Sequence, residues 1–196
     1  MPRLFTALEV PRDAALSLSL LRGGLPGARW VDVENYHVTL RFIGDVEAPV
    51  ADEIANAIDR IRRAPFSLRL SGVGAFGTKK PHSIHATVAP SAELTQLQAD
   101  IERSCQRLGL PADTRKFVPH VTLARLRNPS ASDIATYLSA RGNFATSPFK
   151  VGRFVLMSSK DSVGGGPYVV EETWPLDARE PKASLSADEW LAGAQP

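Results

Sequence analysis

Cysteine is almost absent from this chain: Cys105 is the only one among 196 residues. A single cysteine cannot form an intramolecular disulfide, and no Cys-x-x-Cys pair or Cys/His set has the spacing of a zinc site. The sequence therefore excludes a disulfide scaffold and a zinc module. It favours a cytoplasmic protein in a reducing compartment, with no metal and no cofactor.

Long hydrophobic runs and an excess of one charge are also missing. The apolar residues near the N-terminus are interrupted by Glu9, Pro11, Arg12 and Asp13, so neither a signal peptide nor a membrane span is predicted. Lys and Arg number 23 against 21 Asp and Glu, which gives a formal charge of +2. This balance argues against a protein that coats long nucleic acids, but it leaves a short anionic ligand open.

What is present is the composition of an ordinary globular protein, with 43% apolar and 22% charged residues. A chain of 196 residues is long enough to bury most of its apolar surface, so its core needs no disulfide or metal. The length predicts one domain, or at most two.

The chain contains an internal repeat. The tetrapeptide His-Val-Thr-Leu at residues 37–40 recurs at 120–123, an offset of 120 − 37 = 83. Pro-Phe at residues 65–66 recurs at 148–149 with the same offset. Two matches in one register argue against coincidence, and they predict a duplicated unit.

Each half of the chain has the pattern strand, helix, strand, helix, strand. The expected helices cover residues 12–22, 50–61, 92–108 and 132–140, and a last extended run covers 168–174. We therefore expect an α+β fold in which the two halves form two lobes of antiparallel sheet plus helices around a pseudo-twofold cleft.

The repeat also sets the expected domain limits. Residues 1–178 should form a single bilobal domain, with internal repeats at about 3–76 and 82–159. Residues 179–196 are rich in Ala, Ser, Pro and charged residues, and we expect a C-terminal tail without chemistry there.

The repeated tetrapeptide places polar side chains on one face of each strand. Because side chains alternate along a regular strand, the expected open face carries His37, Thr39 and Arg41, and the core face carries Val38, Leu40 and Phe42. His120, Thr122 and Ala124 repeat the first set. Each lobe thus offers an imidazole and a hydroxyl, two residues apart, to the cleft.

Two histidines that face each other across a cleft suit the in-line cleavage of a phosphodiester. One imidazole takes a proton from the attacking oxygen, and the other protonates the leaving oxygen on the far side of phosphorus. Thr39 and Thr122 would donate hydrogen bonds to the non-bridging oxygens. A single His-x-Thr is a weak motif, but packing alone requires only the Val and Leu of each copy.

Residues near the motifs are candidate substrate contacts. Arg115 and Arg125 flank the second motif and are candidate phosphate or RNA ligands, although Arg125 shares the face of His120 only if a bulge intervenes. An aromatic surface for a nucleobase could be built from Phe42 and from Trp30, Tyr36 and Phe117.

The other two histidines follow a different pattern. His82 and His85 lie three residues apart in an expected strand, so they should point to opposite faces. This spacing does not suit a metal pair, and structural or peripheral roles are expected for both.

The extended motifs resemble the 2H phosphoesterase superfamily and, within it, the RNA 2′,3′-cyclic phosphodiesterases, also called 2′-5′ RNA ligases. The resemblance covers about residues 2–177. It rests on Arg-Leu-Phe-Thr-Ala-Leu at 3–8, Asn-Tyr-His-Val-Thr-Leu-Arg-Phe-Ile-Gly at 35–44 and Arg-Lys-Phe-Val-Pro-His-Val-Thr-Leu-Ala-Arg at 115–125.

The resemblance implies a bilobal, metal-independent enzyme that opens a terminal 2′,3′-cyclic phosphate on RNA to a 2′-phosphomonoester. It implies that His37 is the proton donor to the leaving 3′ oxygen and that His120 is the proton acceptor that activates water. Thr39 and Thr122 would hold the phosphate. Reversible 2′-5′ joining of RNA ends, notably tRNA halves, is associated with the same family.

One departure from the family concerns the strand after Pro81, where many relatives have an Arg and a Trp and this chain has His82 and His85. Three alternatives stay open: a phosphodiesterase acting on small cyclic nucleotides, a non-catalytic RNA-binding module, and a duplicated structural domain. The intact histidines and threonines argue against the second, because binding alone needs no proton-transfer groups. We expect a monomer.

Overall fold

The computed structural model describes residues 3–77, 80–159 and 166–177. The expected tail, residues 179–196, lies outside the described residues. Within the described ranges no helix is both long and apolar enough to cross a membrane.

The described chain is a mixture of strands and helices, as the sequence predicts. The strands are β1 (Arg3–Glu9), β2 (Ala28–Trp30), β3 (His37–Asp45), β4 (Phe66–Leu68), β5 (Leu70–Phe76), β6 (Ser83–Val88), β7 (His120–Leu126), β8 (Phe149–Val151), β9 (Arg153–Ser159) and β10 (Tyr168–Pro175). The helices are α1 (Arg12–Ser19), α2 (Ala48–Ile58), α3 (Ala92–Arg107) and α4 (Ala131–Arg141), and a short 3-10 turn covers Val33–Asn35.

The four expected helices are confirmed to within three residues at each end, and α3 shows why. Its backbone begins after Ser91, whose side chain accepts a hydrogen bond from the Leu94 amide and so caps the first turn. The buried residues of α3, Leu94, Leu97, Ile101, Ser104 and Cys105, recur every three or four positions. This buried stripe packs the helix against the main sheet.

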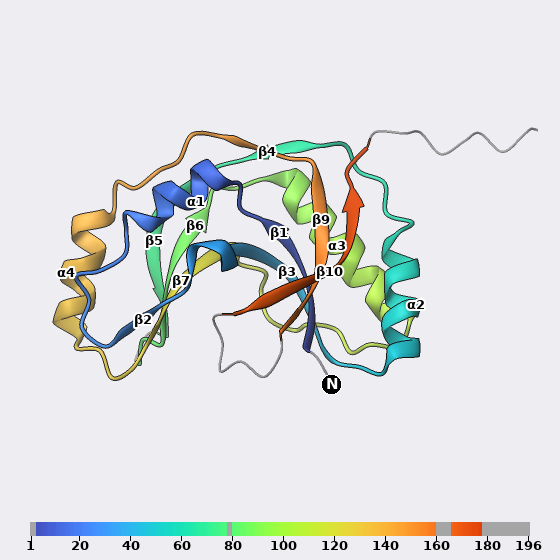
Figure 1. Ribbon diagram of the computed structural model, residues 1–196, viewed down its shortest axis with the longest axis horizontal. Helices are drawn as coiled ribbons and strands as arrows, with labels where there is room; N and C mark the ends of the chain where they lie inside the picture. The colour runs from blue at the N-terminus through green and yellow to red at the C-terminus, as the bar shows by residue number, and fades with distance from the viewer. Residues whose placement is uncertain (1–2, 78–79, 160–165, 178–196) are drawn as a thin grey trace, which may run out of the picture.

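The main sheet has the strand order β10-β9-β1-β3-β7-β6-β5, with β2 beside β7, and every described pair in it is antiparallel. The strands β3 and β7 are joined only at Val38 and Val121. The sheet therefore divides into two lobes at this point, and Figure 1 shows them on either side of the molecule, with α2 and α3 in one and α1 and α4 in the other.

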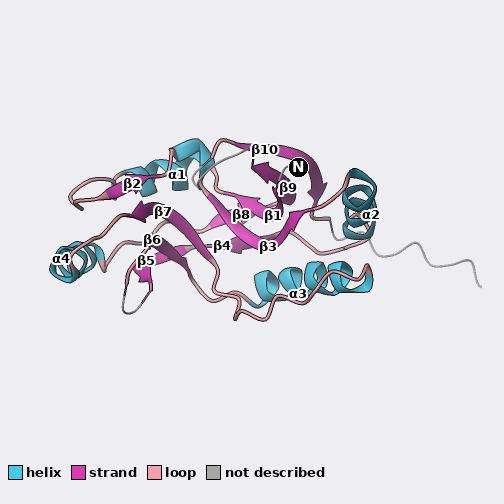
Figure 2. Cartoon of the chain, turned by 90° about the horizontal axis from the view of Figure 1, so that it is seen from below, coloured by secondary structure: helices cyan, strands magenta, loops and turns pink. Residues whose placement is uncertain are grey.

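The lobes do not coincide with the halves of the chain. The order β1-α1-β3-α2-β4-β5 is followed by β6-α3-β7-α4-β8-β9, but β9 pairs with β1 and β5 pairs with β6. Each half thus gives its last strand to the other lobe, and β4 pairs with β8 between them (Figure 2). The expectation of one lobe per half needs this correction, since a strand pattern does not identify its partner strand.

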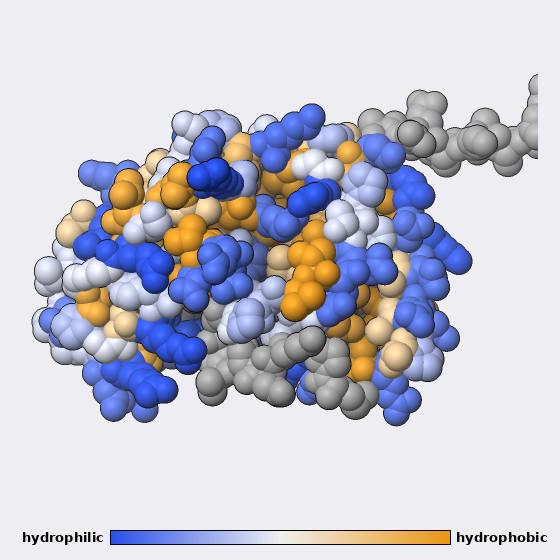
Figure 3. Space-filling model, in the orientation of Figure 1, coloured by the Kyte–Doolittle hydropathy of each residue, from blue (hydrophilic) through white to orange (hydrophobic). Residues whose placement is uncertain are grey.

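The core lies between the sheet and the helices. Val38, Leu40, Val121 and Leu123 from the two histidine strands are buried in it, as the alternation predicts. The face shown in Figure 3 is mostly hydrophilic, and its apolar residues include a group over β10, where Val169 and Val170 are exposed. Because the apolar residues of both motifs are buried in this core, the His and Thr residues that alternate with them lie on the other side of the sheet.

Candidate active site

The two repeated motifs meet in one cleft. Because β3 and β7 are neighbours at the junction of the lobes, His37 and Thr39 come from one lobe and His120 and Thr122 from the other. All four line a cleft of about 1190 Å³. The structure therefore brings together the four residues that the sequence singled out.

Each histidine is anchored through the same ring atom. Nδ1 of His37 lies 2.8 Å from the carbonyl oxygen of Asn35, and Nδ1 of His120 lies 2.7 Å from that of Val118. A carbonyl can only accept, so Nδ1 carries a hydrogen in both rings and donates it. This arrangement leaves Nε2 of each ring as the nitrogen that can exchange a proton with a substrate.

Aromatic rings hold both imidazoles in place. The His37 ring lies 5.1 Å from the Phe5 ring and 4.9 Å, edge to face, from the Tyr168 ring. On the other lobe, the His120 ring lies 4.7 Å, edge to face, from Phe76 and 5.3 Å from His85. Contacts with these rings and the anchored Nδ1 restrict each imidazole to one orientation, which proton transfer in a fixed direction requires.

Tyr168 is itself fixed to the loop that anchors His37. Its amide donates to the Oδ1 of Asn35, 3.3 Å away. Gly166 has a φ of +95°, and a Cβ there would come within 2.4 Å of the Asn35 side chain. A glycine is therefore required two residues before Tyr168, both for the backbone conformation and for space.

A bulge in each histidine strand changes which side chains face the cleft. Thr6 pairs with Arg41 and Ala7 with Thr39, so Leu40 is an extra residue in β3; likewise Leu123 is extra in β7. Beyond each bulge the alternation shifts by one residue. The expected orientations of Arg41, Phe42 and Ala124 are therefore wrong: Arg41 and Ala124 are buried, and Phe42 is 52% exposed.

The same shift resolves the position of Arg125. The bulge at Leu123 puts Arg125 on the face of His120 and Thr122, and all three line the cleft. Counted from the two motif histidines, Phe42 and Arg125 occupy equivalent positions on the two strands. One wall of the cleft thus presents an aromatic ring where the other presents a guanidinium group.

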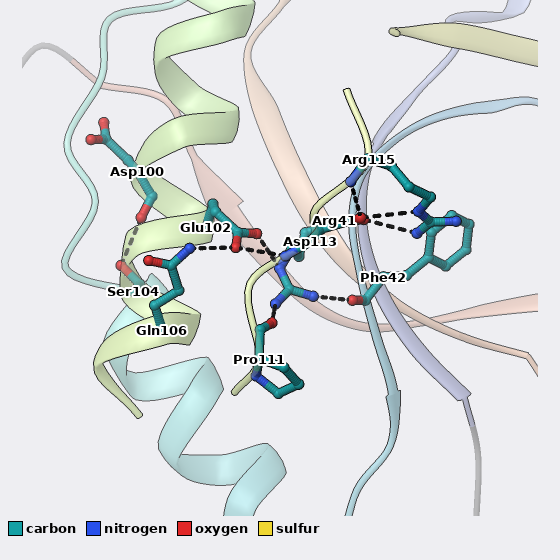
Figure 4. Close-up of polar contacts among 9 residues, drawn as sticks. All are labelled: Arg41, Phe42, Asp100, Glu102, Ser104, Gln106, Pro111, Asp113 and Arg115. Carbon is teal, nitrogen blue, oxygen red and sulfur yellow. Dashed lines mark hydrogen bonds and ion pairs between the residues drawn. The ribbon is translucent and has the colours of Figure 1, made fainter. Parts of the chain in front are cut away.

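Arg41 is used to hold the loop that leads to His120. Its guanidinium group forms an ion pair with Glu102 of α3 and donates to the carbonyl oxygens of Phe42 and, at 2.6 Å, Pro111 (Figure 4). The carboxylate of Glu102 also accepts from the Asp113 amide at 3.1 Å. This buried ion pair fixes residues 111–113 against α3.

The next residues of this loop carry a second ion pair to the rim of the cleft. Asp113 accepts two hydrogen bonds from the Arg115 guanidinium group, at 2.9 and 2.8 Å, and these bonds lower the pKa of Asp113 to about 2. Arg115 in turn lies 5.9 Å from the centre of the Phe42 ring (Figure 4). Both Phe42 and Arg115 line the cleft, so the two candidate contacts are neighbours there.

The surroundings of both motif histidines favour the neutral imidazole. Burial lowers the pKa of His37 to about 4, against the hydrogen bond to Asn35, which raises it; the charges of His120 and Arg125 lower it further. Burial also lowers the pKa of His120, and Arg125 adds to this effect. An anionic ligand would reverse the contribution of charge, because it favours the protonated imidazole.

His85 is closer to the site than the sequence predicts. Its ring is buried, stacks on Phe76 at 4.1 Å and contacts the His120 ring. Gly74 of β5 is paired with His85. A Cβ on Gly74 would lie 2.8 Å from the His85 Nε2, so a glycine is needed there to make room for the ring. The position of His85 is thus buried beside the cleft and not peripheral, whereas His82 is exposed and lines the cleft.

We expect His85 to make the fold sensitive to acid. Burial lowers the pKa of His85 to about 4, and the charge of His120 adds to this shift. Since the unfolded value is about 6.5, the stability due to a neutral His85 is complete above pH 6.5 and is lost as the pH falls towards 4. Between pH 7 and pH 4.5, His85→Phe should gain about 2 kcal/mol in unfolding free energy relative to the unsubstituted protein.

Urea unfolding at the two pH values measures this difference. His82→Phe is the matched control: His82 is exposed and this variant keeps His85, so its unfolding free energy should fall with pH as that of the unsubstituted protein does. Equal pH dependence in His85→Phe and the unsubstituted protein would contradict the burial of a neutral ring.

Of the aromatic residues expected to form a surface for a nucleobase, some line the cleft and others do not. Tyr36 is buried, and Trp30 packs on Tyr137 at 5.9 Å between ring centres; Phe117, like Phe42, lines the cleft. The cleft is also lined by four residues that were not predicted to contribute to it, Phe5, Arg29, Phe76 and Tyr168. No local motif marks them, because they come from strands and loops distant from the two tetrapeptides. In the described part of the chain, no three His, Cys, Asp or Glu side chains are grouped as metal ligands would be.

This fold, with two matched His-x-Thr strands beside one cleft, defines the class of two-histidine phosphoesterases. A model of the family described as the 2′-5′ RNA ligase superfamily matches residues 19–162. The chain belongs to that superfamily.

Relatives and solved structures agree with this assignment. The chain is 39% identical over 120 residues to an RNA 2′,3′-cyclic phosphodiesterase of Aeropyrum pernix, covering 60% of this chain and 68% of the relative. It is 37% identical over 130 residues to one of Geobacillus stearothermophilus, covering 62% of this chain but 41% of that relative. The crystal structure of E. coli LigT complexed with 3′-AMP is 27% identical, with a TM-score of 0.73, and covers 90% of this chain and 99% of that one.

Proposed function

We propose that this protein hydrolyses the 2′,3′-cyclic phosphate at the end of an RNA and leaves a 2′-phosphomonoester. The observation that carries the proposal is the matched pair of imidazoles, each anchored through Nδ1 to a backbone carbonyl and each beside a threonine, in a single cleft. The relatives named RNA 2′,3′-cyclic phosphodiesterase support the same reaction.

In the proposed reaction, Nε2 of His120 accepts a proton from water as the water oxygen attacks phosphorus. The bond between phosphorus and the 3′ oxygen breaks, and Nε2 of His37 gives its proton to that oxygen. The products are a 2′-phosphate and a 3′-hydroxyl, with His37 neutral and His120 protonated. Proton exchange with solvent restores the starting state.

The charges around the histidines fit these roles. The lowered pKa of His120 keeps it deprotonated, as a base must be before the reaction. His37 must begin protonated, and the negative charge of the bound phosphate favours that form against the effect of burial. The hydroxyl groups of Thr39 and Thr122, with the Arg125 guanidinium group, would bind the non-bridging oxygens as their charge grows.

The surroundings of the cleft favour an RNA end over a small cyclic nucleotide. Seven basic residues of the described chain line it, namely Arg3, Arg29, Arg41, Arg115, Lys116, Arg125 and Arg127. Phe42 and Arg115 offer a ring and a cation to a nucleobase. One chain supplies both histidines, so we propose a monomer, working in the cytoplasm on RNA ends such as those of tRNA halves.

The test compares two substrates in the presence of EDTA. We expect the protein to convert an oligoribonucleotide ending in a 2′,3′-cyclic phosphate to the 2′-phosphate product, with a higher kcat/KM than for 2′,3′-cyclic AMP. Phosphorus NMR of the product identifies the position of the phosphate. A faster reaction with the mononucleotide would favour the small-nucleotide alternative, and no reaction with either would leave the RNA-binding module as the better hypothesis.

A further inference from the structure

Three arginine side chains lie together on the cleft face of β2 and β7. Arg29 of β2 is paired directly with Arg125 of β7, and Arg127 follows immediately after the end of β7. All three are exposed and line the cleft. Side chains in directly paired positions on antiparallel strands lie about 5 Å apart at Cβ, so these like charges are held close together.

Among the described residues, these three arginines have no anionic partner. In the described part of the chain, no carboxylate forms an ion pair with Arg29, Arg125 or Arg127, and their side chains donate no hydrogen bond. The other arginines of the cleft differ, because Arg3, Arg41 and Arg115 are paired with Asp45, Glu102 and Asp113. The free positive charge of this cleft is therefore concentrated on the β2–β7 wall, with Lys116 as a further cation on the loop before β7.

Like charges in paired positions destabilise a sheet, and no carboxylate of the described chain offsets the repulsion between Arg29 and Arg125. An external polyanion would offset it. We propose that the β2–β7 wall is the track for the body of the RNA, and that Arg29 and Arg127 bind the phosphodiester groups on the 5′ side of the terminal cyclic phosphate. This proposal deepens the proposed function and rests on it.

The order of the residues along the track follows from their distance to the histidines. Arg125 lies on the His120 face, and besides burial its charge lowers the pKa of both His37 and His120. Arg127 follows the end of β7, beyond Arg125 when counted from His120, and Arg29 lies beside Arg125 on β2, so both lie farther along the wall from the motif histidines. The chain of the RNA thus runs from Arg125 at the reaction centre outward to Arg29 and Arg127.

The opposite wall is built for a different group. The position equivalent to Arg125 is Phe42, and the arginine beside it, Arg115, is already neutralised by Asp113. An aromatic ring next to a paired cation suits a nucleobase better than a phosphate. The two walls therefore differ in the groups that they can bind, and among the described residues the β2–β7 wall is the one that offers a series of unpaired positive charges.

Binding without turnover tests this assignment. The probe is a 5′-fluorescein pentaribonucleotide that ends in a 2′-phosphate, which is the product of the reaction and is not consumed. Fluorescence anisotropy gives its Kd at several salt concentrations for the unsubstituted protein, Arg29→Gln and Arg127→Gln. Each substitution should raise Kd by about 5- to 10-fold. It should also reduce the slope of log Kd against log salt concentration by about 0.7, the value for one phosphate contact of a single strand.

Two controls separate this role from general effects. Arg60→Gln removes one positive charge from a residue that does not line the cleft, and it should change Kd by less than about twofold. With 2′-AMP as a competing ligand, Arg29→Gln and Arg127→Gln should change the inhibition constant far less than they change Kd for the pentanucleotide. Equal losses for 2′-AMP and the pentanucleotide would overturn the assignment, as would substitutions that act no more strongly than Arg60→Gln.

Melting temperature provides a further readout. If Arg29 serves RNA and not the fold, Arg29→Gln removes a repulsion, and the melting temperature at low salt should rise slightly while RNA binding weakens. A falling melting temperature would indicate a structural role and contradict the proposal. Because binding is measured on the product, the anisotropy experiment tests the position of the RNA whether or not the protein is active. Absence of hydrolysis by the unsubstituted protein would defeat the proposed function alone.

Discussion

Replacement of either motif histidine by alanine is expected to lower kcat for the opening of a 2′,3′-cyclic phosphate by about 10²- to 10⁴-fold. His120→Ala removes the group that accepts the proton of water, and His37→Ala removes the group that protonates the leaving oxygen. Initial rates with the cyclic-phosphate oligonucleotide measure the loss. The control is Asn56→Ala, because Asn56 is exposed on α2 and does not line the cleft, so this variant should keep the rate of the unsubstituted protein. Near-normal rates for either motif variant would contradict the two-histidine mechanism.

The dependence of rate on pH tests which histidine acts as the base and which as the acid. Because burial lowers the pKa of His120, the acid limb of kcat/KM should lie below the usual histidine value of about 6.5. Burial lowers the pKa of His37 to about 4 in the free protein, whereas a bound anion raises it. Since kcat/KM reports the free enzyme and kcat the complex, the alkaline limb of kcat should lie at higher pH than that of kcat/KM. Coincident alkaline limbs would show that substrate does not raise the pKa of His37.

The sequence predicted the four motif residues because the duplication repeats them in one register. His37, Thr39, His120 and Thr122 precede the bulges, so regular alternation describes them correctly. Beyond Leu40 and Leu123 the alternation shifts, and no residue type in either tetrapeptide signals that an extra residue is present. Bulges depend on the pairing of a strand with its neighbour, which a local pattern does not contain.

The same reason explains what was missed in the fold. The helices follow from spacing and capping within one segment, and those limits were nearly correct. The exchange of β5 and β9 between the lobes is a property of distant pairs, and so are the contacts of Phe76 and His85 with His120. The backbone carbonyls of Asn35 and Val118, which set the direction of both imidazoles, carry no mark of residue type at all.

Breaking the ion pair between Arg41 and Glu102 should be the most destabilising single change near the site. Arg41 is 6% exposed, and its charge is compensated by Glu102 and by two backbone carbonyls. Glu102→Gln leaves the guanidinium group buried without a counter-charge, and Arg41→Met leaves the carboxylate in the same position. Each is expected to lower the unfolding free energy by about 3 to 5 kcal/mol, measured by urea unfolding.

A double substitution tests whether the loss of unfolding free energy comes from an unpaired buried charge. Arg41→Met combined with Glu102→Leu removes both charges, so the combined loss should be smaller than the sum of the single losses. Arg63→Met is the matched surface control: Arg63 pairs with Asp100 but its side chain is 33% exposed, and the loss should stay within about 1 kcal/mol. Additive losses in the double variant would mean that the two charges act independently.

The ion pair should also affect the reaction through the loop that it holds. Arg41 and Glu102 fix residues 111–113, and this loop continues to Val118, whose carbonyl oxygen orients His120. In Arg41→Met, assayed at a temperature where it is folded, we expect kcat to fall by about tenfold because a loosened anchor misdirects the base. The double variant should recover stability without recovering kcat, since neither methionine nor leucine can bind the carbonyl of Pro111 or the amide of Asp113. Recovery of both together would show that the pair serves the fold alone and that Val118 is positioned by other contacts.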